Sequence, residues 1–287
     1  MANSRLKGVS TTADSLLSLS ALPGIAEATE AARRSCTQLR WHEALRRRVP
    51  EAAAESRIRG ARASAALDGA EMDLSLVRDL MRGATPWPPS PDPLEAVLRG
   101  AIQATAETEH IRATISTAPS QALARVHAAA AGHLLLDSRV GRPRQGGEVS
   151  LEFSDLGPCP DEPVVRERLS GIVELLLCAG DGSAVVVAAL VHAEIATVRP
   201  FVRGNGLVAR AMERAVIQAS GMDPTGVAVV ELGHLAAGPA YLGALAAYGS
   251  GSPQGVGLWI AHCAGAIVTG AQEGGRIADA VLAGRLT

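Results

Sequence analysis

The chain has 287 residues and a formal net charge of −2, and hydrophobic residues make up 47% of it. This length allows one large domain with an extension or two compact units, and the balanced charge gives no reason to expect a nucleic-acid partner. Because only two Phe and two Tyr are present, the core must be built from Ala, Val and Leu. Such a core favours closely packed helices.

Shifts in composition divide the chain along its length. The first residues are rich in Ser, Thr and Leu and are expected to be loosely ordered. A proline-rich stretch further on is predicted to be a stiff linker. The predicted order is a tail over 1–20, an N-terminal helical part over 21–84, the linker over 85–93 and the core over 94–287.

The basic clusters and the cysteines indicate an ordinary intracellular protein. Arg33-Arg34 and Arg46-Arg47-Arg48 are more typical of a solvated helix face than of a nucleic-acid or membrane contact. No apolar run is long enough to span a bilayer, and the N-terminus lacks the apolar core of a signal peptide. The scattered cysteines argue against a zinc site and for reduced thiols in the cytoplasm. They are Cys36, Cys159, Cys178 and Cys263.

Residues 141–155 are predicted to form a short β-hairpin. Glycines surround an alternating apolar run of Val149, Leu151 and Phe153, and this period of two is typical of a strand. The pattern alone fits an unremarkable surface hairpin as well as a functional one. A proline-rich break follows, and a helix is predicted over 164–179.

The most informative stretch is Val198-Arg-Pro-Phe-Val-Arg-Gly-Asn-Gly-Leu-Val-Ala-Arg210, between an apolar helix and a second helix predicted over 207–220. Gly204 and Gly206 let a ligand approach the main chain closely. Free N–H groups and the positive end of the helix dipole point at this turn, which suits phosphate. An ordinary loop-to-helix junction would also carry such glycines, but the three arginines around the turn favour an anion site.

This stretch resembles the signature of the Fic (Fido) family, His-Pro-Phe-x-Asp/Glu-Gly-Asn-Gly-Arg-x-x-Arg. The resemblance implies a mainly α protein: a Fic-like helical bundle with a short β-hairpin flap and an N-terminal helical extension. Many Fic proteins transfer AMP from ATP to a hydroxyl on a target protein. The matching residues are Phe201, Gly204, Asn205, Gly206 and Arg210.

The family's chemical positions carry different residues here. Arg199 occupies the place of the general-base histidine, Arg203 that of the magnesium-holding acid, and Leu207 that of a phosphate-gripping arginine. A guanidinium accepts no proton at neutral pH, a positioned base contributes roughly 10²–10⁴-fold in rate, and magnesium needs oxygen ligands. We therefore expect no catalytic residue and no magnesium at the family position, while ATP or another nucleotide still binds. The expected nucleotide- or anion-binding residues are Arg199, Phe201, Arg203, Gly204, Asn205, Gly206 and Arg210.

A second family pattern, Ser/Thr-x-x-x-Glu-Gly/Asn, marks an inhibitory helix whose glutamate pairs with the last arginine of the signature. Ser64, Asp68 and Gly69 fit it, with aspartate in place of glutamate. An Asp68–Arg210 pair would be charge-assisted, although the shorter side chain reduces its reach. Residues 141–155 resemble the flap that aligns the target, so we expect a target or partner protein there. The chain is also compatible with a homodimer.

The predicted function is that of a Fic-domain protein related to protein AMP-transferases, catalytically inactive and regulatory or scaffolding. His192 lies about two helical turns before Arg199, roughly 10 Å away, so it is a poor replacement base. A partly buried histidine satisfied by its helix neighbours is favoured.

Two alternatives stay open. One is an active transferase of nucleotidyl or phosphate-linked groups with a non-standard mechanism. The other is a dinucleotide-binding oxidoreductase, because Gly204-x-Gly206-x-x-Ala209 fits that fingerprint and 227–231 could be a strand. The fingerprint needs a strand before its first glycine, and Pro200 disfavours one.

Overall fold

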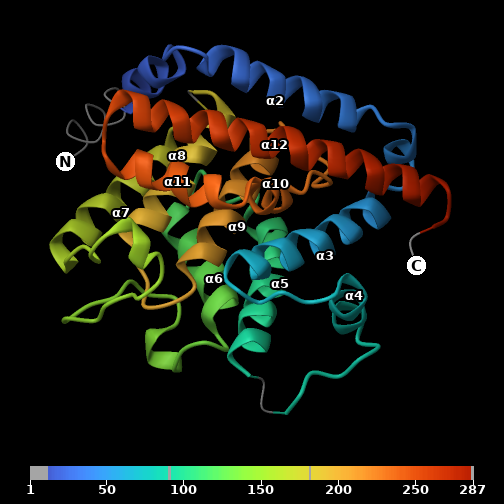
Figure 1. The fold of residues 1–287 in the computed structure, drawn as a ribbon, viewed down its shortest axis with the longest axis horizontal. Coiled ribbons are helices and arrows are strands. Elements are labelled where there is room, and N and C mark those ends of the chain that lie inside the picture. The colour runs from blue at the N-terminus through green and yellow to red at the C-terminus, as the bar shows by residue number, and fades with distance from the viewer. Residues whose placement is uncertain (1–11, 90–91, 181, 286–287) are drawn as a thin grey trace.

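The chain folds into a helical bundle in a computed structural model that describes residues 12–89, 92–180 and 182–285 (Figure 1). Along one side of the bundle, α2 (Ile25–Arg40) lies beside the 30-residue α12 (Pro253–Leu282). The remaining helices are α3 (Val49–Leu67), α4 (Leu74–Arg82), α5 (Pro93–Ile111), α6 (Pro119–Ala131), α7 (Glu162–Leu177), α8 (Ala184–Val198), α9 (Asn205–Ala219), α10 (Val230–Ala237) and α11 (Pro239–Gly249), with 3-10 turns at Glu43–Arg46, Asp137–Arg139 and Ser154–Leu156.

At the centre of the bundle, α8 and α9 are buried over nearly their whole length. They pack on each other, and neighbouring helices cover them: α7, α11 and α12 around α8, and α3, α5 and α6 around α9. Small residues let other helix pairs approach closely as well. At the contact of α5 with α6, a Cβ added at Gly100 would lie 2.1 Å from the backbone oxygen of Ala130. The prediction of closely packed helices around a core of small aliphatic residues is confirmed.

The predicted helices occur with small shifts at their ends. The helix predicted over 207–220 begins earlier, as α9, because Gly204 adopts a left-handed φ of 84° and serves as its N-cap. The tail expected to be loosely ordered is helical from residue 12 to 20, where Leu16 is buried. The rest of that tail, residues 1–11, lies outside the described residues.

The β-hairpin predicted over 141–155 is not formed. These residues make turns and the start of a 3-10 helix, and none of them lies in a strand. Gly141, Gly146 and Gly147 have positive φ, which breaks an extended chain. The polar groups bond elsewhere instead: the Arg144 N–H donates to the Pro200 oxygen at 2.8 Å. We call residues 141–158 the 141–158 loop.

The absence of strands also decides against the oxidoreductase alternative. A dinucleotide site of that kind needs a buried parallel sheet, whereas no residue within 12–89, 92–180 or 182–285 belongs to a strand. Residues 227–229 lead directly into α10. Among the helices that the structure describes, none has both the length and the apolar character needed to cross a membrane.

Candidate functional site

The turn between α8 and α9 is held rigidly by side chains on both sides. The Asn205 amide spans it, with Oδ1 accepting from the Phe201 N–H at 2.9 Å and Nδ2 donating to the Phe201 oxygen at 2.9 Å. The Phe201 ring stacks on His127 of α6, with centroids 3.8 Å apart. His127 in turn bonds through Nε2 to the Arg203 oxygen. Phe201 and Asn205 thus shape the turn from within.

The N-terminus of α9 holds a carboxylate that belongs to the chain itself. The N–H groups of Gly204 and Asn205 donate to the two Glu152 oxygens at 2.6 and 2.8 Å, and Asn205 Nδ2 donates to Glu152 Oε2 at 2.7 Å. This is how a helix N-terminus binds an anion. Burial raises the pKa of Glu152, the nearby Asp68 charge raises it further, and the three donors oppose both effects.

Glu152 was missing from the predicted site. The sequence places it between two exposed or half-buried apolar residues of an expected strand, with no signal that its side chain turns toward Gly204. Its contact depends on the path of the 141–158 loop, which local patterns do not specify.

The Asp68–Arg210 pair, which the sequence left open because of the short aspartate, is formed. Arg210, only 1% exposed, donates through Nη2 to Asp68 Oδ1 at 2.8 Å and to the Ser64 backbone oxygen at 2.9 Å, and through Nε to Ser64 Oγ at 2.8 Å. The short aspartate reaches because Gly206 has no side chain: an added Cβ there would lie 2.7 Å from Asp68 Oδ1. Gly69, with φ 88°, follows at the end of α3.

One nitrogen of the buried Arg210 is left over. Its Nη1 makes no hydrogen bond with any described residue, and it lies 3.0 Å from where a Gly206 Cβ would be. Burial lowers the pKa of Arg210, but the adjacent Asp68 and Tyr241 side chains outweigh burial and hold that pKa above its usual value. A buried N–H without a partner is costly, so this atom is available to an acceptor at Gly206.

Arg199 is placed differently from the expectation that it faces the ligand. It closes α8 with a left-handed φ of 49° and is 2% exposed. Its guanidinium donates to backbone oxygens of the 141–158 loop: Glu152 at 3.4 Å, Phe153 at 3.2 Å, Gly157 at 3.0 Å and Pro158 at 2.7 Å. In this structure Arg199 therefore anchors a loop, while Arg203 remains exposed beside the turn.

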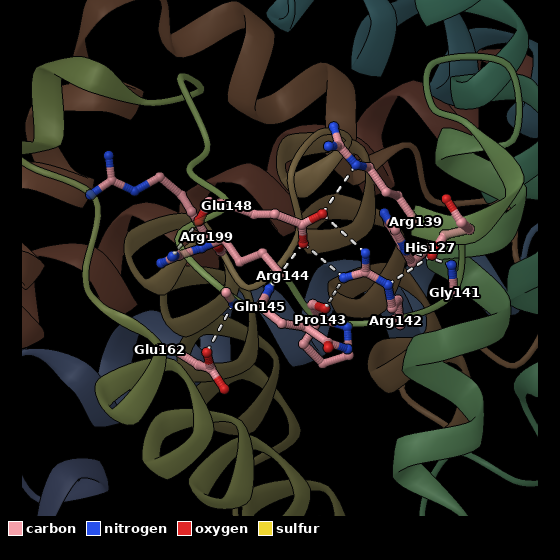
Figure 2. Close-up of polar contacts among 12 residues, drawn as sticks. His127, Arg139, Gly141, Arg142, Pro143, Arg144, Gln145, Glu148, Glu162 and Arg199 are labelled. Carbon is pink, nitrogen blue, oxygen red and sulfur yellow. Dashed lines mark hydrogen bonds and ion pairs between the residues drawn. The ribbon is translucent and has the colours of Figure 1, made fainter.

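The first half of the 141–158 loop is fixed by a separate polar cluster (Figure 2). Arg144 extends to the end of α8, where its Nε donates to the Arg199 oxygen at 2.7 Å. Glu148 pairs with Arg139 at 3.0 Å and with Arg142 at 2.7 Å. These ion pairs hold residues 142–148 independently of Glu152.

A cavity of about 620 Å³ brings the site together. Its polar wall includes Asp68, Glu152, Arg203, Gly204 and Gly206, so both carboxylates and the turn face one space. Its apolar wall is supplied by Val97, Leu134, Phe153, Leu207, Leu235 and Leu242. The volume lies in the range of small-molecule sites.

Behind the cavity lies a buried network centred on Glu213. Its Oε2 is 2.5 Å from His192 Nδ1 and 2.8 Å from His234 Nε2, and the other His192 nitrogen lies 2.9 Å from the Tyr241 hydroxyl. These residue types can bind a metal. However, two ligands at about 2.0–2.2 Å from one ion stand farther apart than 2.5 Å, so the contacts are hydrogen bonds.

This network also bears on whether His192 is free to act as a base. Burial lowers the pKa of His192 to about 4, and both ring nitrogens have partners within the network. The expectation of a partly buried histidine satisfied by its helix neighbours is wrong in its details: His192 is fully buried, and its partners Glu213 and Tyr241 come from α9 and α11.

No family model matches the sequence, and no curated protein matches it. Solved structures do. A Fic family protein from Desulfovibrio desulfuricans G20 superposes with a TM-score of 0.69 at 20% identity, covering 86% of this chain and 73% of that chain. Fic-1 from C. elegans gives 0.62 at 18% identity, with 91% and 75% covered. A Fic domain containing signaling protein from Bacteroides thetaiotaomicron VPI-5482 gives 0.61 at 13% identity, with 88% and 98% covered.

Proposed function

Because the chain has the Fic fold, we propose that it binds a phosphate-bearing ligand such as ATP in the cavity beside Gly204 and acts as a regulatory or scaffold protein. The observation that carries this proposal is the built anion seat. Two backbone N–H groups and the Asn205 amide converge on one carboxylate at 2.6 to 2.8 Å. Phosphate oxygens are acceptors of the same kind.

Charge and shape support the same ligand class. Arg203 is exposed at the edge of the cavity, and Arg210 Nη1 is an unpartnered donor behind Gly206. The apolar wall from Leu207 to Leu242 suits a base or another flat apolar group. A nucleotide would use both walls at once.

Ordinary AMP transfer does not fit the groups available. The general base of the family motif is replaced by Arg199, whose guanidinium is bonded to four carbonyls of the 141–158 loop. His192 is buried and hydrogen-bonded on both sides. We therefore propose binding without the family's base-assisted transfer, with the exposed Val149 and Leu151 of the 141–158 loop as contacts for a partner protein.

Calorimetric titration of ATP, first with magnesium and then with EDTA, tests the proposal. We expect binding that survives EDTA, because arginines rather than a metal meet the phosphates. Arg203→Ala should weaken it about three- to tenfold by removing one cation from the cavity edge. Arg47→Ala, at an exposed arginine of the N-terminal part, is the matched control and should leave affinity unchanged.

Two other outcomes would contradict parts of the proposal. Binding that requires magnesium would point to Asp68 and Glu152, the carboxylates at the cavity, as ligands of the ion. A labelled-AMP transfer assay with the wild type and Asp68→Ala would then decide for the transferase alternative. Absence of binding in both buffers would reject the phosphate site and leave a Fic-shaped scaffold.

A further inference from the structure

The carboxylate of Glu152 sits on the donors that a ligand phosphate would use. We propose that Glu152 is a built-in competitor for the anion seat of α9, which must leave before a phosphate group binds, and that residues 152–158 move with it. This inference rests on the proposed function, and it assigns that site an internal regulator. The Gly204 and Asn205 N–H groups cannot bond Glu152 and a phosphate fully at the same time, since each has one hydrogen.

The closed arrangement contains three unfavourable features in one short segment. The Glu152 carboxylate is largely buried, which disfavours its charge. It shares the cavity with the like charge of Asp68. The next residue, Phe153, adopts a left-handed φ of 52°, which is strained for a bulky side chain. A segment with such costs stays closed only while its bonds to the body of the protein hold.

Those bonds come from the α9 turn and from Arg199. Of all the described non-glycine residues, Phe153 and Arg199 are the two with positive φ, and they are joined directly: Arg199 Nη1 donates to the Phe153 oxygen at 3.2 Å. Arg199 also reaches the Gly157 and Pro158 oxygens. The arginine in place of the family's base therefore holds the segment that carries the competitor.

A phosphate group has what it needs to displace this carboxylate. It offers more acceptor oxygens and more negative charge, and two donors near the seat are left over by Glu152. Arg210 Nη1, in a side chain 99% buried, has no hydrogen-bond partner among the described residues, and Arg203 is exposed at the cavity edge. The Glu152 carboxylate bonds the turn, and no hydrogen bond joins it to Arg210 Nη1 or to the Arg203 side chain. Replacing the Glu152 carboxylate is therefore favourable for a phosphate-bearing ligand that reaches Arg203 and Arg210 Nη1.

The test compares ATP affinity in EDTA for the wild type, Glu152→Gln and Asp155→Asn. Glu152→Gln removes the charged competitor, and we expect its affinity to rise about tenfold. Asp155 is an exposed acid three residues away on the same cavity, so Asp155→Asn controls for the general loss of negative charge and should change affinity less than twofold. Glu152→Asp keeps the charge but shortens the reach, and should fall between wild type and Glu152→Gln.

Hydrogen exchange of residues 152–158 supplies the second readout. ATP should speed exchange there in the wild type, whereas Glu152→Gln should already exchange fast without ligand; unchanged exchange in α8 and α9 verifies the fold. Equal ATP affinities in wild type and Glu152→Gln, or unchanged exchange in that variant, would overturn the competitor while leaving the phosphate site intact. Failure of every variant to bind ATP would overturn the proposed function itself and the inference with it.

Discussion

At the residue scale, Arg199 shows most clearly that a position in a sequence motif does not determine what its side chain contacts in the structure. The sequence motif places Arg199 where a catalytic group stands in the Fic family. Its positive charge was the reason to expect that it contacts an anionic ligand. In the structure its left-handed backbone turns the guanidinium toward the 141–158 loop. The Asp68–Arg210 pair could be named from two sequence patterns but not decided, because the reach of the short aspartate depends on how closely it approaches Gly206.

If Arg199 anchors the 141–158 loop, removing its side chain should lower the free energy of unfolding. Arg199→Ala leaves several carbonyls of residues 152–158 without donors, and we expect the free energy of unfolding to fall by about 2 to 3 kcal/mol. Arg203→Ala, four residues away on the same turn but exposed, should change it by less than about 0.5 kcal/mol. Urea unfolding measures both, and equal stabilities would refute the anchor.

At the scale of elements, the sequence predicts helices well and the 141–158 loop badly. The helices that became α7 and α9 have caps and apolar faces within their own residues, so local signals suffice. A hairpin needs a cross-strand partner, and the alternation of Val149, Leu151 and Phe153 specified none. The loop bonds instead to the end of α8 through Arg144 and Arg199, and to the start of α9 through Glu152. Tertiary hydrogen bonds overrode a local pattern.

The packing of α5 on α6 gives a prediction at this scale. Gly100 lets the two helices touch, since an added Cβ would lie 2.1 Å from the Ala130 oxygen. Gly100→Ala should therefore lower the free energy of unfolding by at least about 2 kcal/mol. It should also shift α6, whose His127 stacks on Phe201 at the anion turn, so ATP binding should weaken.

A second glycine serves as a control, because a Gly→Ala substitution there meets no neighbouring atom. Gly171 lies within α7, and nothing surrounds the position of its added Cβ within 4 Å. Gly171→Ala should raise the free energy of unfolding by up to about 1 kcal/mol, because alanine favours the helix. Thermal unfolding of both variants gives the comparison, and similar melting temperatures would show that α5 and α6 can separate at no cost.

At the scale of the whole molecule, two buried histidines and a half-buried one link the stability of the fold to pH. Burial lowers the pKa of His127, His192 and His262 to about 4. Two of them belong to the structures around the cavity: His127 supports the anion turn, and His192 belongs to the Glu213 network. Protonation at any of these places adds a charge to a tightly packed interior. Acid should therefore unfold the molecule through its core rather than from its surface.

The sign of the effect follows from proton binding. An unfolded histidine titrates near 6.5, so between pH 6.5 and 4 the unfolded chain binds protons that the folded chain excludes, and stability falls as pH falls. Each histidine contributes at most about 1.4 kcal/mol per pH unit. Glu152, whose pKa burial raises, acts in the opposite sense as a single group. Urea unfolding at pH 7.5, 6.0 and 5.0 measures the slope. His127→Gln, which can keep a donor and an acceptor, should reduce the slope of stability against pH by about the contribution of a single histidine. A free energy of unfolding that does not depend on pH would mean that these rings are hydrated in the folded protein.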